Sequence, residues 1–235
     1  MCYTKAIKGK RGKKEMKVLF VGNSYTYYHD MPEVFRALCR ENGRDVEVFS
    51  VTAGGRKLVQ NAEGNDEKAE MLKTLARENR FDVVILQEQS LLPIVNNEMF
   101  MSGVKGVYEM LKSSADRFVL YATWGRKTGS PDLATLEMDH DSMTEALAEA
   151  YGRAASEIGA DISPVGYAFS EAMRIDDGIE LYHSDKTHPS DLGTALGALV
   201  HYRTCFAEMP QSIASLGALD GAEDVLIRAV VKVSK

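Results

Sequence analysis

The feature that most constrains the fold of this chain is a series of short, unbroken apolar runs separated by longer amphipathic segments. The runs 18–21 and 83–86 contain only apolar residues, most of them β-branched, which is typical of strands buried on both faces. We expect strands at 18–21, 46–51, 83–86, 118–123 and 162–165. We expect helices at 31–42, 66–79, 99–113, 139–158 and 191–206, with a further one near 222–231. This alternation predicts a three-layer α/β/α fold with a parallel sheet.

The composition narrows the class of protein and its partners. The chain has 235 residues, of which 45% are hydrophobic and 26% are charged, as in ordinary globular domains. A net charge of -6 disfavours nucleic-acid binding as the main role, because domains that wrap nucleic acid are usually basic. No apolar run approaches the length of a membrane span, so we expect no membrane partner. Cys2, Cys39 and Cys205 are far apart, which indicates a reducing, cytoplasmic location rather than a disulfide framework.

The first fifteen residues form a separate basic segment. Its basic residues are Lys5, Lys8, Lys10, Arg11, Lys13 and Lys14. A secretory signal needs an apolar stretch of about 7–15 residues after such a segment, but the next apolar run covers only 18–21 before a turn. We therefore expect a solvated basic tail over 1–15 and a single domain over 16–235, with Met16 as an alternative start.

Polar and glycine-rich loops follow the first three predicted strands. In parallel α/β sheets, ligands bind outside the carboxyl ends of the strands. Ser24 follows the first strand, where a serine either presents its hydroxyl and backbone N–H to a ligand or merely forms a turn. Gly54 and Gly55 follow the second strand and would let a backbone N–H approach a ligand. Segment 87–90 follows the third strand and begins with three long polar side chains, two of which are amides that can stabilise an oxyanion.

The segment 183–191 carries the most specific local pattern. Asp185 and His188 are three residues apart in a polar loop interrupted by proline, ahead of the last core helix. A carboxylate beside a histidine can fix the imidazole tautomer and stabilise imidazolium, and Ser24 needs such a base to act as a nucleophile. Two other interpretations fit the segment. It can be a solvated helix-entry loop, or a divalent-metal site formed by His183, Asp185 and His188.

Together these motifs resemble the SGNH hydrolase superfamily, also called GDSL-type esterases and lipases, from residue 18 to about residue 206. The first block of that superfamily matches the apolar run that ends in Gly22-Asn23-Ser24. The second block supplies a glycine after the second strand, here Gly55 or Gly54. The last block matches Asp185-Lys186-Thr187-His188.

The resemblance implies a fold, a mechanism and a set of site residues. The implied fold is flavodoxin-like, with a five-stranded parallel sheet. The implied triad is Ser24 as nucleophile, His188 as base and Asp185 as the acid that orients His188. The implied oxyanion hole consists of the backbone N–H groups of Ser24 and Gly55 and the side-chain amide of Gln89. No metal and no organic cofactor are implied.

Two departures from the superfamily pattern concern residues around the serine. Asn23 stands where the superfamily usually has aspartate, a residue that supports the active-site loops rather than the chemistry. The third block is normally Gly-x-Asn-Asp, whose asparagine completes the oxyanion hole, whereas this chain has Gln87-Glu88-Gln89-Ser90. Counting from the strand end puts Gln89 at the asparagine position, with Gln87 as a second candidate. A related substitution in carbohydrate acetylesterases of the superfamily favours a sugar ester.

The sequence therefore predicts a serine esterase for a short-chain acyl ester, with an acetyl ester of a carbohydrate or small molecule as the favoured substrate. Two alternatives stay open: a non-catalytic ligand-binding module on the same fold, and the metal-dependent hydrolase described above. Four aromatic residues near strand ends either form a wall for the substrate or pack the loops; these are Tyr25, Tyr27, Tyr28 and Trp124. Arg126 or Lys127 is a candidate to reach a charged group on the substrate.

Overall fold

The sheet contains five strands that are all parallel. The computed structural model describes residues 15–234, so Cys2 and nearly all of the predicted basic tail lie outside the described residues. The strands are β1 (Met16–Gly22), β2 (Val46–Thr52), β3 (Val83–Leu86), β4 (Phe118–Tyr121) and β5 (Asp161–Ser163). Their order is β2-β1-β3-β4-β5, and every neighbouring pair is parallel. The predicted three-layer α/β/α fold with a flavodoxin-like five-stranded sheet is confirmed.

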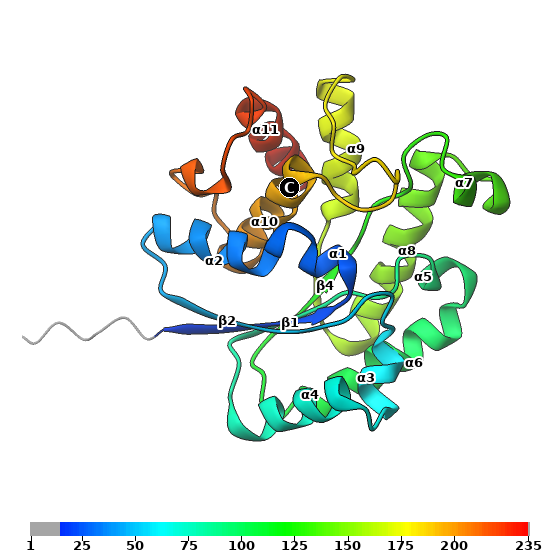
Figure 1. Ribbon diagram of the computed structural model, residues 1–235. Coiled ribbons are helices and arrows are strands. Elements are labelled where there is room, and N and C mark those ends of the chain that lie inside the picture. Colours follow the sequence, from blue (N-terminus) through cyan, green and yellow to red (C-terminus); the bar gives the residue numbers. More distant parts are fainter. Residues whose placement is uncertain (1–14, 235) are drawn as a thin grey trace, which may run out of the picture.

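Helices cover both faces of this sheet (Figure 1). One layer contains α2 (Met31–Glu41), α9 (Val165–Ile175), α10 (Asp191–Phe206) and α11 (Glu223–Val233). The other contains α3 (Leu58–Glu63), α4 (Glu67–Glu78), α6 (Asn97–Leu111) and α8 (His140–Ile158). Short helices in the loops are α1 (Ser24–Tyr27), α5 (Leu92–Val95) and α7 (Pro131–Leu136), with 3-10 turns at Tyr28–Asp30 and Ala214–Leu216. Within residues 15–234, no helix combines the length and apolarity that crossing a bilayer demands.

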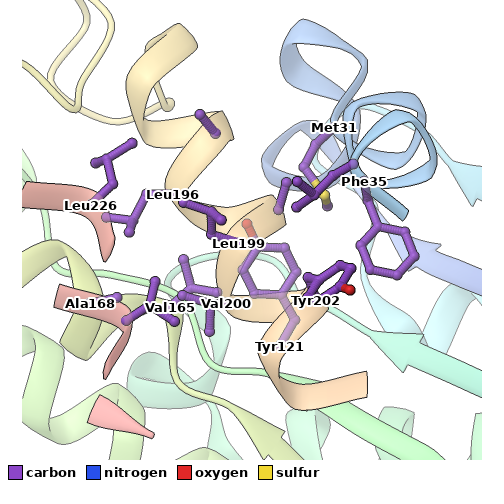
Figure 2. Packing of buried hydrophobic residues seen from close by; sticks show 14 of the residues in the cluster. Met31, Phe35, Tyr121, Val165, Ala168, Leu196, Leu199, Val200, Tyr202 and Leu226 are labelled. Atoms are coloured by element: carbon purple, nitrogen blue, oxygen red, sulfur yellow. The ribbon is translucent and has the colours of Figure 1, made fainter. Parts of the chain in front are cut away.

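Strand β1 explains why the core has two halves. Residues 18–21 are all buried, and successive side chains of a strand point to opposite faces of the sheet. Val18 and Phe20 join the cluster that contains Phe35 of α2 and Leu199 of α10, part of which is drawn in Figure 2. The two other side chains join the cluster on the opposite face. Burial on both faces accounts for the unbroken apolar run.

One large helix was not predicted from the sequence. The fifth strand was expected to continue to residue 165, but β5 ends at Ser163 and α9 begins at Val165. Pro164 has no N–H for the sheet ladder and instead precedes the first turn of α9. A Cβ on Gly166 would lie 2.2 Å from the carbonyl oxygen of Thr123. Gly166 is therefore needed for the close packing of α9 against the segment after β4.

Candidate active site

Ser24, His188 and Asp185 lie together at the carboxyl edge of the sheet. Ser24 begins α1 directly after β1, and the other two lie in the loop between α9 and α10 (Figure 1). His188 Nε2 lies 2.9 Å from Ser24 Oγ, and His188 Nδ1 lies 2.6 Å from Asp185 Oδ2. Because a carboxylate only accepts hydrogen bonds, Nδ1 donates to Asp185, and Nε2 of the neutral ring accepts from the serine hydroxyl. This is the connectivity of a nucleophile, a base and an orienting acid.

The loop that carries Asp185 is folded around its own carboxylate. Asp185 Oδ1 accepts hydrogen bonds from the backbone N–H groups of Thr187 and His188, both at 2.9 Å. Partial burial raises the pKa of Asp185, but the hydrogen bonds from the His188 side chain and from these two N–H groups outweigh it and hold the pKa at about 2. Asp185 therefore stays ionised at neutral pH beside the imidazole.

Two tyrosines fix the plane of the His188 ring. The Tyr28 ring stacks on the imidazole, with centroids 4.2 Å apart and an interplanar angle of 10°. The Tyr25 ring meets the imidazole edge to face, with centroids 5.5 Å apart. A stacked aromatic face also favours a positive charge on the imidazole. The two rings therefore restrict the orientation of the His188 imidazole.

Gln87 holds the turn that presents Ser24. Its Oε1 accepts hydrogen bonds from the Asn23 backbone N–H at 2.9 Å and from the Thr26 hydroxyl at 3.0 Å. Gln87 is fully buried at the end of β3. A Cβ on Gly22 would lie 2.6 Å from Gln87 Oε1, so this close approach requires glycine at position 22. The polar residue directly after a buried strand was the signal for Gln87, but the sequence did not show which residues it binds.

Asn23 connects the serine turn to the glycine loop after β2. Its Oδ1 accepts the Tyr25 backbone N–H at 3.2 Å, and its Nδ2 donates to the Arg56 carbonyl oxygen at 3.0 Å. Arg56 follows Gly55, whose φ of +64° lies in the left-handed region that glycine adopts readily. An aspartate carboxylate has no N–H to give to the Arg56 carbonyl, so this link depends on the amide of asparagine.

The Arg56 side chain anchors the same glycine loop. Its guanidinium, which is almost completely buried, donates to the two carboxylate oxygens of Asp66 at 2.8 and 2.9 Å and to Asn61 Oδ1 at 2.6 Å. The hydrogen bonds from Arg56 and from the Ala69 N–H lower the pKa of Asp66 to about 2, so the ion pair persists at neutral pH. Sequence analysis missed this pair because the segment around Gly55 has the composition of a flexible turn.

Gln89 and Gln87 use their amides differently. Gln89 Oε1 accepts hydrogen bonds from the backbone N–H groups of Leu91 and Leu92, both at 3.0 Å. These two hydrogen bonds fix the side-chain oxygen of Gln89 at the start of α5. The Gln87 NH2 group instead donates to the backbone carbonyl of Glu88. Of the two oxyanion candidates, only Gln89 keeps its NH2 group outside the hydrogen bonds that hold the described residues together.

The predicted aromatic wall is only partly present. Trp124 is fully buried and stacks between Tyr25 and Phe169, with ring centroids 4.6 and 4.2 Å away. Trp124 and Tyr25 therefore pack the loops beneath the triad and are not available to a substrate. Tyr27 is 40% exposed, and Tyr28 covers one face of the His188 imidazole. These two tyrosines are the members of the set that can contact a substrate.

Arg126 is also not placed to bind a charged substrate. Its guanidinium is buried and donates to Asp132 at 2.7 Å, to the Ser90 hydroxyl at 2.9 Å and to the Tyr25 hydroxyl. Lys127 forms an ion pair at the surface. The hypothesis that Arg126 reaches the substrate is therefore wrong. This buried residue instead links Ser90, in the loop after β3, to Tyr25 of α1.

The metal-site interpretation receives little support from the geometry. His183 Nδ1 lies 3.8 Å from Asp185 Oδ2, the oxygen that accepts the hydrogen bond from His188. Both ring nitrogens of His188 are engaged, one by Asp185 and one by Ser24. Among residues 15–234, no three His, Cys, Asp or Glu side chains are grouped so that they could hold a metal ion. The arrangement favours the serine interpretation.

Comparison with solved structures identifies the family of the chain. No protein-family model and no curated protein matches it. A Slackia heliotrinireducens protein assigned to the SGNH hydrolases is 30% identical and covers 81% of this chain and 98% of its own, with a TM-score of 0.72. A DUF4886 family protein from Bacteroides uniformis shares the fold at 15% identity, with a TM-score of 0.73 and coverage of 94% and 96%. A variant of Axe2, an acetylxylan esterase from Geobacillus stearothermophilus, shares it at 14% identity, with a TM-score of 0.59 and coverage of 84% and 97%. This chain belongs to the SGNH hydrolase family.

Proposed function

We propose that this chain is a serine esterase that hydrolyses short-chain acyl esters, with acetyl esters of carbohydrates or other small molecules as its substrates. The observation that carries the proposal is the continuous hydrogen-bonded connection from Asp185 through His188 to Ser24, with distances of 2.6 and 2.9 Å. A serine hydroxyl is a weak nucleophile unless a base takes its proton, and this connection supplies the base. Membership of the SGNH hydrolases agrees with this chemistry.

The reaction proceeds in two acyl-transfer steps. His188 Nε2 takes the proton from Ser24 Oγ as the oxygen attacks the ester carbonyl carbon, and the imidazolium then returns that proton to the departing alkoxide. Water repeats the sequence on the acyl-serine, releases the acid and restores the Ser24 hydroxyl. The ionised Asp185 keeps Nδ1 of His188 as the donor and stabilises the imidazolium formed in each step.

The negative oxygen of the tetrahedral intermediate needs hydrogen-bond donors. The proposed donors are the backbone N–H groups of Ser24 and Gly55 and the amide NH2 of Gln89. Their loops follow β1, β2 and β3, three adjacent strands of the sheet. Each donor of this kind typically lowers the barrier by about 2.7–4 kcal/mol. The Gln89 orientation described above, with Oε1 held by two backbone N–H groups, leaves its NH2 available for this role.

Two observations support a small polar substrate. The Asp185 and His188 side chains are 39% and 23% exposed, so the triad opens directly to solvent. Axe2, which shares the fold, is an acetylxylan esterase. An acetyl group needs little enclosure, and the exposed Tyr27 ring offers an apolar face of the kind on which sugar rings stack.

The direct test is hydrolysis of p-nitrophenyl acetate and p-nitrophenyl butyrate in the presence of a chelator. Wild type should favour acetate, and Ser24→Ala should lose nearly all activity. Ser184→Ala is the matched control. This exposed serine lies in the same loop as the acid and base, but its hydroxyl lies beside His183 and not beside His188. A serine-directed phosphonate should form an adduct on Ser24 alone. Activity that survives Ser24→Ala, or is lost to the chelator and regained with metal, would overturn the proposal.

A further inference from the structure

A buried carboxyl group lies behind the proposed oxyanion hole and takes no part in the triad. Glu88 follows β3 directly after Gln87, and its side chain is completely buried. Carboxyl groups are rarely buried so deeply unless they are paired or hydrogen-bonded, because water solvates their charge so well. The partners of Glu88 therefore indicate what the group does.

The Glu88 carboxyl joins two loops of the active site. Its Oε1 and Oε2 lie 3.1 and 3.2 Å from the backbone nitrogen of Leu58, the first residue of α3. Its Oε1 also accepts the backbone N–H of Gln89 at 2.6 Å. Leu58 follows shortly after Gly55, so one carboxyl group holds both the exit of the glycine loop and the backbone of Gln89. Both loops contribute proposed oxyanion donors.

The surroundings of Glu88 make its charge sensitive to pH near neutrality. Burial raises the pKa of Glu88 to about 7, against the opposing effects of the Gln89 and Leu58 N–H groups and the positive charge of Lys57. On the α8 side, the Tyr151 hydroxyl accepts the Glu88 backbone N–H at 3.1 Å. Burial raises the pKa of Tyr151 well above its ordinary value, so the phenol stays neutral. The charge next to the two loops therefore changes on Glu88 itself.

We propose that Glu88 is a positioning residue for ester hydrolysis: its carboxylate holds the glycine loop and Gln89 in the geometry that binds the oxyanion, and its protonation weakens that geometry. The carboxylate offers lone pairs on both oxygens to the Leu58 and Gln89 N–H groups. When Glu88 is protonated, one oxygen carries the proton and has less capacity to accept hydrogen bonds, and its O–H needs an acceptor of its own. This inference rests on the proposed esterase function.

The test is the pH dependence of p-nitrophenyl acetate hydrolysis by the full chain, from about pH 5 to about pH 9. The variants are wild type, Glu88→Gln and Asp66→Asn, and Ser24→Ala serves as the blank. Glutamine keeps an oxygen for the two N–H groups but cannot titrate. Asp66→Asn disturbs the anchor of the same glycine loop, yet Asp66, with its pKa of about 2, is ionised throughout this range.

The expected result is a difference in the shape of the profiles. An imidazole base contributes one proton to the acid limb, so log kcat/KM of Glu88→Gln should fall with a slope of about 1, and that of wild type more steeply around pH 7, where protonation of Glu88 adds a further loss of about 10-fold. The plateau of Glu88→Gln should drop about 10-fold through kcat, with KM nearly unchanged, because a small displacement of oxyanion donors acts mainly on the transition state. Asp66→Asn should keep the wild-type slope. A Glu88→Gln profile with the wild-type slope and plateau would overturn the inference.

A second measurement separates this inference from the proposed function. A group whose pKa is raised in the folded state stabilises the fold below its unfolded value and loses that contribution as pH rises through the folded value. In the Ser24→Ala background, the Tm should therefore fall between about pH 4.5 and about pH 7 relative to that of Ser24→Ala/Glu88→Gln. If the Tm falls in this way but wild type hydrolyses no ester, the proposed function is refuted, whereas the titration of Glu88 is supported. Equal Tm profiles would refute the role of Glu88 even if Ser24-dependent hydrolysis is found.

Discussion

The two sides of the candidate active site are built in different ways. The acid–base side is local and exposed: Asp185 is bound by groups two and three residues further along the chain. The oxyanion side is long-range and buried: Gln87 binds Asn23 across 64 residues, and Glu88 binds Leu58 across 30. A substitution on the local side can remove activity without disturbing the fold, whereas a substitution on the buried side should lower both activity and stability. The predictions below test this difference.

The largest effect is expected on the acid–base side. Asp185→Asn should lower kcat by about 10⁴-fold, because the amide no longer holds the His188 tautomer that accepts the serine proton. The free energy of unfolding should change by less than about 1 kcal/mol, since Asp185 is well exposed. Steady-state kinetics and urea unfolding at neutral pH measure both quantities. A larger loss of stability would show that this loop is as tightly integrated into the fold as the buried side.

Removal of the proposed amide donor should have the next largest effect. Gln89→Ala should lower kcat by about 10²–10³-fold with KM little changed, because the lost hydrogen bond forms in the transition state. Gln89→Asn is the matched variant, since it retains an amide on a side chain one methylene shorter. If Gln89→Ala keeps full kcat, another donor stabilises the oxyanion and the assignment of Gln89 is wrong.

Loss of the Gln87 side chain should damage stability and activity together. Gln87→Leu leaves the Asn23 N–H and the Thr26 hydroxyl without their buried acceptor, which should cost about 2–3 kcal/mol of stability. Displacement of the serine turn should also lower kcat. Gln87→Glu keeps an acceptor oxygen for both groups but buries a carboxyl group with its second oxygen against the Glu88 carbonyl oxygen, so it should also destabilise the protein. Urea unfolding of both variants is the measurement. A Gln87→Leu protein as stable as wild type would show that the Gln87 hydrogen bonds do not stabilise the fold.

The same difference decides what the sequence could predict. The pattern around Asp185 and His188 is visible because its residues are neighbours in the chain, and the unbroken apolar runs identify buried parallel strands directly. The partners of Gln87, and the pairing of Arg56 with Asp66, arise only when distant segments meet at the sheet edge. Residue type alone did not show that Trp124 would be buried beneath the site rather than exposed within it.

Tyr28 allows the finest test of the comparison, because it follows the serine helix α1 in the chain but stacks on the imidazole of the acid–base side. Tyr28→Leu keeps an apolar side chain but removes the aromatic face that favours imidazolium. We expect kcat/KM to fall about threefold to tenfold, as for an aromatic contact of about 0.5–1.5 kcal/mol. Tyr28→Phe keeps the ring and should retain nearly full activity. If Tyr28→Phe is as impaired as Tyr28→Leu, the hydroxyl matters rather than the stacked face. If Tyr28→Leu instead lowers stability more than activity, Tyr28 behaves like the residues of the buried side, although its ring contacts the imidazole of the acid–base side.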